Sequence, residues 1–224
     1  MEMCEVINIF QTNYTKGKID FRVEGVTDTL IFPTDEMREI LRKPEIGEDA
    51  YHEDPTINKL EDLAAKKVGK EASLFIPSGT MGNLITVLTL CHREDEVILE
   101  ATAHMLGEGG GISAFGGVMC RTIFGDKGIL YPHDIKIALI NEHRRIRNFY
   151  PKTKLICLEN PHNRAGGIVI PLEIVKDICQ IAHDNNVFVH LDGARIFHAA
   201  VALNTDAADV AKSVDSVMFC LSKE

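Results

Sequence analysis

The stretch LEIVKDICQIAHDNNVFVHLD, residues 172–192, decides the fold class of this chain. Its first part, residues 172–183, carries apolar side chains at helical spacing and predicts an amphipathic helix. Residues 187–191 follow as a short apolar run that predicts a buried strand, and Asp192 comes directly after it. A helix followed closely by a fully apolar strand is typical of α/β proteins.

The same alternation runs through the rest of the chain. The apolar runs that predict further strands are residues 72–76, 96–99, 118–123, 154–158 and 216–221. The helices that we predict begin near Thr34, run from about Thr56 to Gly69, and cover residues 83–90 and 207–213. This alternation predicts a mostly parallel sheet with both faces covered, a three-layer α/β/α sandwich. Ligands in such folds bind at the carboxyl ends of the strands, so the residues just after each strand are candidates for chemistry.

The composition argues against several classes of function. The 224 residues carry a net charge of −9, which disfavours nucleic-acid binding because phosphate contacts need a basic surface. No apolar run approaches the roughly 20 residues of a membrane span, and the N-terminus lacks the pattern of a secretory signal. The six cysteines form no CxxC pair and are typical of reduced, intracellular thiols. We therefore expect a cytoplasmic protein with no metal site and no nucleic-acid or membrane partner.

The stretch PSGTMGN, residues 77–83, follows a predicted strand and opens a predicted helix. Glycines let backbone amides approach a ligand closely, and a helix N-terminus favours an anion. Gly79 and Thr80 are therefore candidates for a phosphate site. A turn of small residues with a threonine cap is the alternative, because the stretch matches neither the GxGxxG nor the Walker pattern.

Asp192 and Lys223 both follow predicted strands. A carboxylate at the end of an apolar strand is costly unless it is paired, so Asp192 either binds a protonated ring nitrogen or forms a salt bridge with Arg195. Lys223 comes one helix and one strand later, and in a parallel sheet that spacing returns the chain to the same edge. An acid, a lysine and a phosphate-binding turn together fit pyridoxal phosphate. A solvated terminal lysine is the simpler alternative.

Two histidines also come soon after predicted strands. His104 follows the strand of residues 96–99, where a flat imidazole could stack on a cofactor ring. His162 follows the strand of residues 154–158. For each of them a purely structural role in a turn is the alternative.

Longer stretches of the sequence resemble the threonine aldolases, within the fold-type-I pyridoxal-phosphate lyases. The matching text covers roughly residues 26–223 and includes GEDAYHEDPTINKLED, GKEASLFIPSGTMGNL, DEVILEATAH, TKLICLENPHN, HLDGARIFHAAVAL and DSVMFCLSK. The resemblance implies a transferase-like, cofactor-binding large domain of fold type I over residues 33–224, after an N-terminal segment of residues 1–32. It also implies that the C-terminal small domain of the family is absent from this sequence.

The resemblance further implies an activity. The family cleaves β-hydroxy-α-amino acids by a retro-aldol reaction, so L-threonine or L-allo-threonine would yield glycine and acetaldehyde, with pyridoxal 5'-phosphate as cofactor. This reaction belongs to threonine catabolism and glycine biosynthesis, and the resemblance implies a homo-oligomer, either a dimer or a tetramer. Two alternatives stay open: a truncated and inactive chain, and a β-eliminating lyase with the same cofactor.

The resemblance also assigns roles to individual residues. Those that would bind the cofactor are Gly79 and Thr80 at the phosphate, His104 stacked on the ring, Asp192 at the ring nitrogen, Arg195 on the hydroxyl side, and Lys223 as the Schiff-base lysine. Lys223 and His104 would be the catalytic residues. Thr27 and Arg195 would bind the substrate, with Thr27 standing where serine is usual. Phe149 stands where many members carry a histidine.

Overall fold

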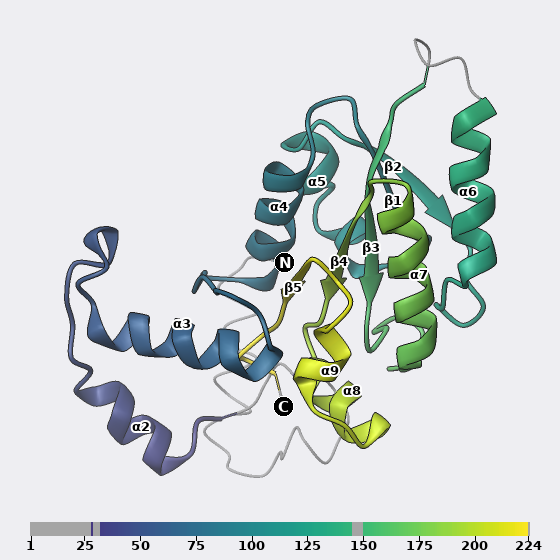
Figure 1. The fold of residues 1–224 in the computed structure, drawn as a ribbon. Helices are drawn as coiled ribbons and strands as arrows, with labels where there is room; N and C mark the ends of the chain where they lie inside the picture. The colour runs from purple at the N-terminus through teal and green to yellow at the C-terminus, as the bar shows by residue number, and fades with distance from the viewer. Residues whose placement is uncertain (1–27, 29–31, 145–149, 224) are drawn as a thin grey trace, which may run out of the picture. The chain divides into compact units, whose positions relative to one another are not determined.

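The computed structural model describes residue 28, residues 32–144 and residues 150–223 (Figure 1). The chain divides into two compact units, one of residues 45–220 and one of residues 1–44 together with 221–224. The larger unit contains the sheet, whereas Lys223 belongs to the smaller one. Thr27 and Phe149 lie outside the described residues, so the roles expected for these positions stay predictions.

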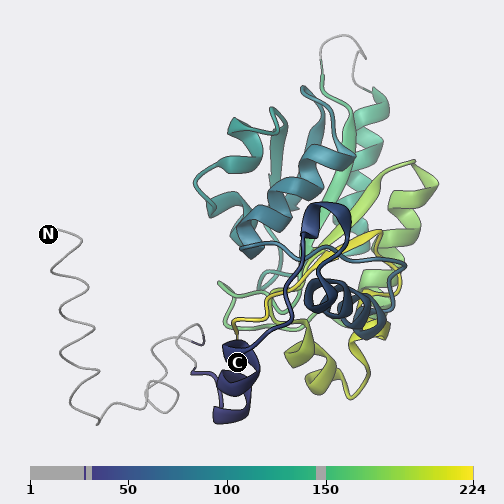
Figure 2. The same ribbon diagram turned by 90° about the vertical axis from the view of Figure 1, so that its left-hand side faces the viewer.

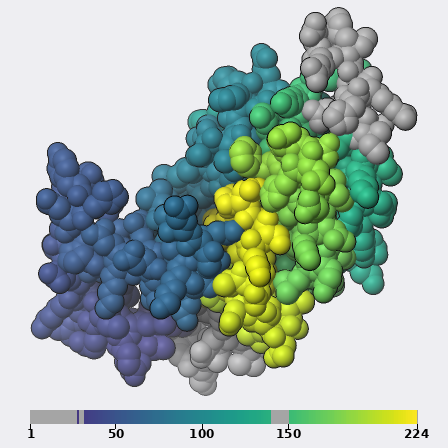
Figure 3. Space-filling model, in the orientation of Figure 1, coloured from purple at the N-terminus to yellow at the C-terminus, as the bar shows by residue number. Residues whose placement is uncertain are grey.

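A five-stranded sheet forms the centre of the larger unit, and its strands are ordered β2-β1-β3-β4-β5. All four neighbouring pairs run parallel, which confirms the expected α/β class. The strands are β1 (Glu96–Glu100), β2 (Met119–Ile123), β3 (Thr153–Glu159), β4 (Phe188–Asp192) and β5 (Ser216–Met218). In the space-filling view, the yellow region that contains β5 reaches the surface (Figure 3).

Helices cover both faces of the sheet (Figures 1 and 2). The helices of the larger unit are α3 (Pro55–Val68), α4 (Gly79–Leu90), α5 (Gly111–Ala114), α6 (Pro132–Arg144), α7 (Leu172–Asp184), α8 (Ile196–Leu203) and α9 (Ala207–Ala211), with 3-10 helices at Asp49–Tyr51 and His104–Gly107. Side chains from α6–α9 pack with Ile98 and Ile156 in one core cluster. Those from α4 and α5 pack with Val97 and Leu155 in another. Because neighbouring strand residues point to opposite faces, the two clusters correspond to the expected three layers.

The predicted helix boundaries have visible local causes. Helix α2 (Asp35–Arg42), in the smaller unit, begins at Thr34, whose hydroxyl accepts a hydrogen bond from the Met37 amide at 3.2 Å. Helix α3 ends at Gly69, which adopts the left-handed conformation with φ of 65°. Both boundaries agree with the sequence analysis. Among the described residues, none of the helices has the length and apolar character needed to cross a bilayer.

One expected strand, residues 72–76, was wrong, since this segment forms no strand. Two of its polar groups hydrogen-bond to Glu61 of α3. The Phe75 amide donates to the Glu61 carboxylate at 2.7 Å, and the Ser73 hydroxyl donates to the Glu61 carbonyl at 2.7 Å. Leu74 is apolar but 65% exposed, so the apolar pattern of this segment does not correspond to a buried strand.

Candidate active site

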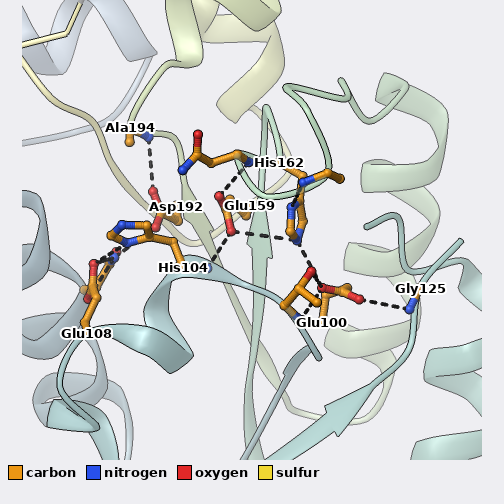
Figure 4. Close-up of polar contacts among 12 residues, drawn as sticks. Glu100, His104, Glu108, Gly125, Glu159, His162, Asp192 and Ala194 are labelled. Atoms are coloured by element: carbon orange, nitrogen blue, oxygen red, sulfur yellow. Dashed lines mark hydrogen bonds and ion pairs between the residues drawn. The ribbon is translucent and has the colours of Figure 1, made fainter. Parts of the chain in front are cut away.

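Three carboxylates line the carboxyl edge of the sheet, because β1, β3 and β4 each end on an acidic residue (Figure 4). These are Glu100, Glu159 and Asp192, and all three are buried. The strands are neighbours in the order β1-β3-β4, and Glu159 pairs in register with Asp192. Burying three carboxylates is costly unless each receives hydrogen bonds. The partners of each acid therefore determine what this edge can bind.

Glu100 is fully satisfied by the protein itself. The amide and the hydroxyl of Thr102 each donate to its Oε2 at 2.6 Å, and the Gly125 amide donates to Oε1 at 3.2 Å. The fully buried ring of His162 lies with Nε2 3.1 Å from Oε2. Burial raises the pKa of Glu100, but the hydrogen bonds and the nearby His162 outweigh it and the pKa is lowered. His162 therefore contacts a buried residue of the fold, as expected if its role is structural.

Glu159 fixes the backbone on either side of the site. Its Oε2 accepts from the His104 amide at 2.7 Å, and its Oε1 accepts from the Asn163 amide at 2.8 Å. The His162 Nε2 lies 3.8 Å from Oε2. Glu159 thus ties the segment that carries His104 to the end of β3.

Asp192 accepts hydrogen bonds on both of its carboxyl oxygens. The Ala194 amide donates to Oδ1 at 3.1 Å, and the Asn83 side-chain amide donates to Oδ2 at 3.0 Å. Burial is the main cause that raises the pKa of Asp192 to about 6, and the charge of Glu159 adds to it, while the two hydrogen bonds act in the opposite direction. A carboxylate has room for about four hydrogen bonds, so Asp192 can still accept from a ligand.

His104 lies beside Asp192 and is oriented by Glu108 (Figure 4). Its Nδ1 is 2.9 Å from Glu108 Oε1, and 45% of its side chain is exposed. Asn83 donates to the same carboxylate at 3.2 Å. A ring nitrogen of His104 and one carboxylate oxygen from each of Glu108 and Asp192 all lie within 4.8 Å of one another, so the imidazole and the two acids form one cluster.

The first turn of α4 reaches the same edge of the sheet. Ser78 caps the helix by accepting from the Met81 amide at 3.2 Å. A Cβ placed on Gly79 would lie 3.0 Å from the Met218 sulfur and 3.1 Å from the Cys220 sulfur, so glycine allows the close approach of α4 to the end of β5. Thr80 is exposed to solvent. The amides at a helix N-terminus lack intrahelical partners, so this turn can bind an anion.

The structure thus brings together some of the residues expected from the sequence. His104 and Asp192 meet, and Gly79 and Thr80 lie one turn before Asn83, which bonds to Asp192. Arg195 precedes α8, three residues after Asp192. Lys223 lies in the smaller unit, and its expected role stays a prediction.

Other site residues escaped the sequence analysis, namely Asn83, Glu100, Glu108, Glu159 and His190, whose Nε2 lies 3.1 Å from Asn83 Oδ1. Glu100 and Glu159 could have been found, because each ends an apolar strand as Asp192 does. Asn83, Glu108 and His190 carry no such signal, since they join the site only through tertiary contacts.

Comparisons with known proteins show the family of this chain. Residues 26–224 match the family model described as beta-eliminating lyase. The chain belongs to the beta-eliminating lyase family. It is 43% identical over 199 residues to low-specificity L-threonine aldolase 1 of Arabidopsis thaliana, covering 88% of this chain and 55% of that protein. The low specificity L-threonine aldolase of Escherichia coli O157:H7 is 38% identical over 198 residues, covering 88% of this chain and 58% of that protein.

A comparison with solved structures bears on the fold. A solved structure of threonine aldolase from Leishmania major has a TM-score of 0.74 at 24% identity, covering 87% of this chain and 56% of that one. At this identity the likeness shows a shared fold. The chain spans about half the length of the curated relatives it matches.

Proposed function

We propose that this chain is the cofactor-binding part of a carbon–carbon lyase that uses pyridoxal phosphate to cleave L-threonine or L-allo-threonine into glycine and acetaldehyde. The observation that carries the proposal is the meeting of Asp192, His104 and the first turn of α4 at the carboxyl edge of the sheet. Membership of the beta-eliminating lyase family and the names of the threonine aldolase relatives support it. The family resemblance adds the expectation of a cytoplasmic homo-oligomer.

The donor set of the site fits pyridoxal phosphate. Asp192 is buried, accepts two hydrogen bonds and has capacity left, which suits the cationic N–H of a protonated pyridine ring. The N-terminus of α4, with the exposed hydroxyl of Thr80, suits a phosphate dianion. The half-exposed ring of His104 offers a flat face for an aromatic ring. When bound, pyridoxal phosphate supplies an aldehyde for the substrate amine and a ring that accepts the electrons released at Cα.

The chain's own residues would bind and orient. Asp192 would accept the hydrogen bond of the ring nitrogen, and Gly79 and Thr80 would donate to the phosphate. Arg195 would bind the substrate carboxylate, together with the hydroxyl of Thr27. The Glu108 carboxylate would accept a hydrogen bond from His104 Nδ1–H in the neutral imidazole, and Nε2 would then carry the lone pair that can accept a proton.

Lys223 is the amine that would anchor the cofactor. The chain leaves β5 beside the Asp192 loop, where the Cys220 amide donates to the Ala194 carbonyl at 3.4 Å. Lys223 comes three residues after Cys220. The resemblance to the threonine aldolases supports its role as this amine.

The test is to add pyridoxal phosphate to the purified chain, remove the excess and record the visible absorbance and the release of acetaldehyde from L-threonine. We expect a retained visible band and acetaldehyde formation, both lost in Lys223→Ala. Lys212→Ala removes an exposed lysine from the same part of the chain and should change neither. A colourless parent, or a Lys223→Ala variant with full activity, contradicts the proposal. Release of ammonia in place of acetaldehyde would indicate β-elimination.

A further inference from the structure

A row of hydrogen-bonded polar side chains runs from Ser216 of β5, which is partly buried, to Asp192, the proposed cofactor acid. The Ser216 hydroxyl lies 2.8 Å from His190 Nδ1, and His190 Nε2 lies 3.1 Å from the Asn83 carbonyl oxygen Oδ1. The Asn83 amide nitrogen Nδ2 then donates to Asp192 Oδ2 at 3.0 Å. Asn83 and His190 are fully buried, so water does not compete for the hydrogen bond between them or for that of Asn83 with Asp192.

The two carboxylates beside Asn83 fix the direction of this row. Asn83 Nδ2 faces Asp192 Oδ2 and also Glu108 Oε1 at 3.2 Å, and only the NH₂ end of an amide can donate to two carboxylates. Its Oδ1 must therefore accept, and the donor is His190 Nε2–H. A neutral imidazole has one N–H, so His190 Nδ1 accepts from the Ser216 hydroxyl. Each group donates to the next, in the direction of Asp192.

The ionisation of His190 is consistent with this arrangement. Burial lowers the pKa of His190 to about 4, although the Ser216 backbone carbonyl favours the protonated ring. His190 is therefore neutral at physiological pH and keeps the single N–H that the row requires. The titratable groups near Asp192 are Glu159 and Cys157 from β3, Glu108 after the 3-10 helix, and His104, which also contacts Glu108.

The Asn83 amide donates hydrogen bonds to two different carboxylates. One N–H of its amide goes to Asp192, which would contact the ring nitrogen of the cofactor. The other goes to Glu108, which also binds His104 Nδ1. Without the Asn83 amide, neither Asp192 nor Glu108 would receive a hydrogen bond from this residue. If the amide were reversed, its carbonyl oxygen would face both carboxylates. Either change favours protonation of Asp192.

We propose that Asn83 is a positioning residue that holds Asp192 as an ionised carboxylate and orients His104 through Glu108, and that His190 fixes the direction of the Asn83 amide. The proposal rests on the proposed function, since that function makes Asp192 and His104 cofactor contacts. Ser216, His190 and Asn83 act through Asp192 and Glu108 and touch no reacting atom.

The first experiment measures the carboxyl group of Asp192 by carbon-13 NMR titration of the cofactor-free 224-residue chain, with the signal assigned by its loss in Asp192→Asn. We expect Asn83→Leu to raise the proton affinity of Asp192 about tenfold or more, which is about one pKa unit. Thr89→Leu changes an exposed residue of the same helix and should leave the titration unchanged. An unchanged titration of Asp192 in a folded Asn83→Leu variant overturns the proposal.

A matched pair of variants tests His190 without removing Asn83. The side-chain nitrogen of glutamine can occupy the place of Nε2, whereas that of asparagine reaches only the place of Nδ1. His190→Gln should therefore keep the titration of Asp192 close to that of the parent, and His190→Asn should raise its pKa. Equal titrations in the two variants contradict the role of His190.

Cofactor affinity provides a readout that separates this inference from the proposed function. If the parent binds pyridoxal phosphate, we expect Asn83→Leu and His190→Asn to weaken binding about tenfold or more, and His190→Gln to weaken it less. If the parent binds no cofactor, the proposed function fails, and the NMR titrations still decide whether Asn83 and His190 control Asp192.

Discussion

Two buried groups of β4 make the stability of this chain depend on pH with opposite signs. The pKa of Asp192 is raised from 3.8 to about 6 by burial, so the stability that it contributes is lost as the pH rises through about 6. The pKa of His190 is lowered from 6.5 to about 4 by burial, so its stability is lost as the pH falls from about 6.5 to about 4. Each difference, about two pKa units, corresponds to about 3 kcal/mol. The two effects nearly cancel in the parent.

Single substitutions separate the two effects. Asp192→Asn removes the carboxyl group whose contribution to stability is lost at high pH. The free energy of unfolding of this variant, relative to that of the parent, should therefore rise by about 3 kcal/mol between about pH 3.5 and pH 7. His190→Gln removes the other group, and its free energy of unfolding relative to the parent should fall by about 3 kcal/mol over the same range.

The assay is urea denaturation of the cofactor-free chain at a series of pH values. Subtracting the parent curve at each pH removes the contribution of the groups that titrate alike in both proteins, and a constant offset from the substitution itself has no slope. Curves for both variants that stay parallel to the parent would refute the reasoning. Slopes of the same sign would refute it as well, because the two pKa shifts have opposite directions.

Two further predictions concern the glycines and the thiols. Gly128 has φ of +82°, and a Cβ there would lie 2.8 Å from the ring of His162, whereas Gly166 has φ of +85° with nothing within 4 Å. Gly128→Ala should therefore lower the free energy of unfolding by about 1–3 kcal/mol more than Gly166→Ala, as measured by urea denaturation. Burial raises the pKa of the Cys157 thiol well above its ordinary value, so a thiol reagent followed by peptide mapping should modify the half-buried Cys120 long before Cys157.

The arrangement of strands could be predicted from the sequence because each strand is a short apolar run flanked by helical patterns. The five strands of the sheet lie where those runs predict them, within a few residues at each end. The run at residues 72–76 has the same apolar character and forms no strand. Ser73 and Phe75 in this run hydrogen-bond to Glu61 of α3, and the apolar pattern does not predict this tertiary contact.

The candidate site was only partly predictable. Asp192 stood out as an acid at the end of an apolar strand, and the same signal applies to Glu100 and Glu159. Asn83 and His190 carry no such signal, because their roles depend on the packing of α4 against the sheet. They lie 107 residues apart in the sequence, which does not show that they are in contact. Residue type at a strand end is a local property, whereas a buried hydrogen-bonded row depends on packing.

The most direct test of the proposed function is to locate the cofactor on the chain. The parent is incubated with pyridoxal phosphate, reduced with borohydride so that the cofactor is fixed to the lysine that holds it, digested, and mapped by mass spectrometry. Our account predicts that the label is found on Lys223 and is displaced when L-threonine is present before reduction. A label spread over surface lysines, or found on another single lysine, would contradict it.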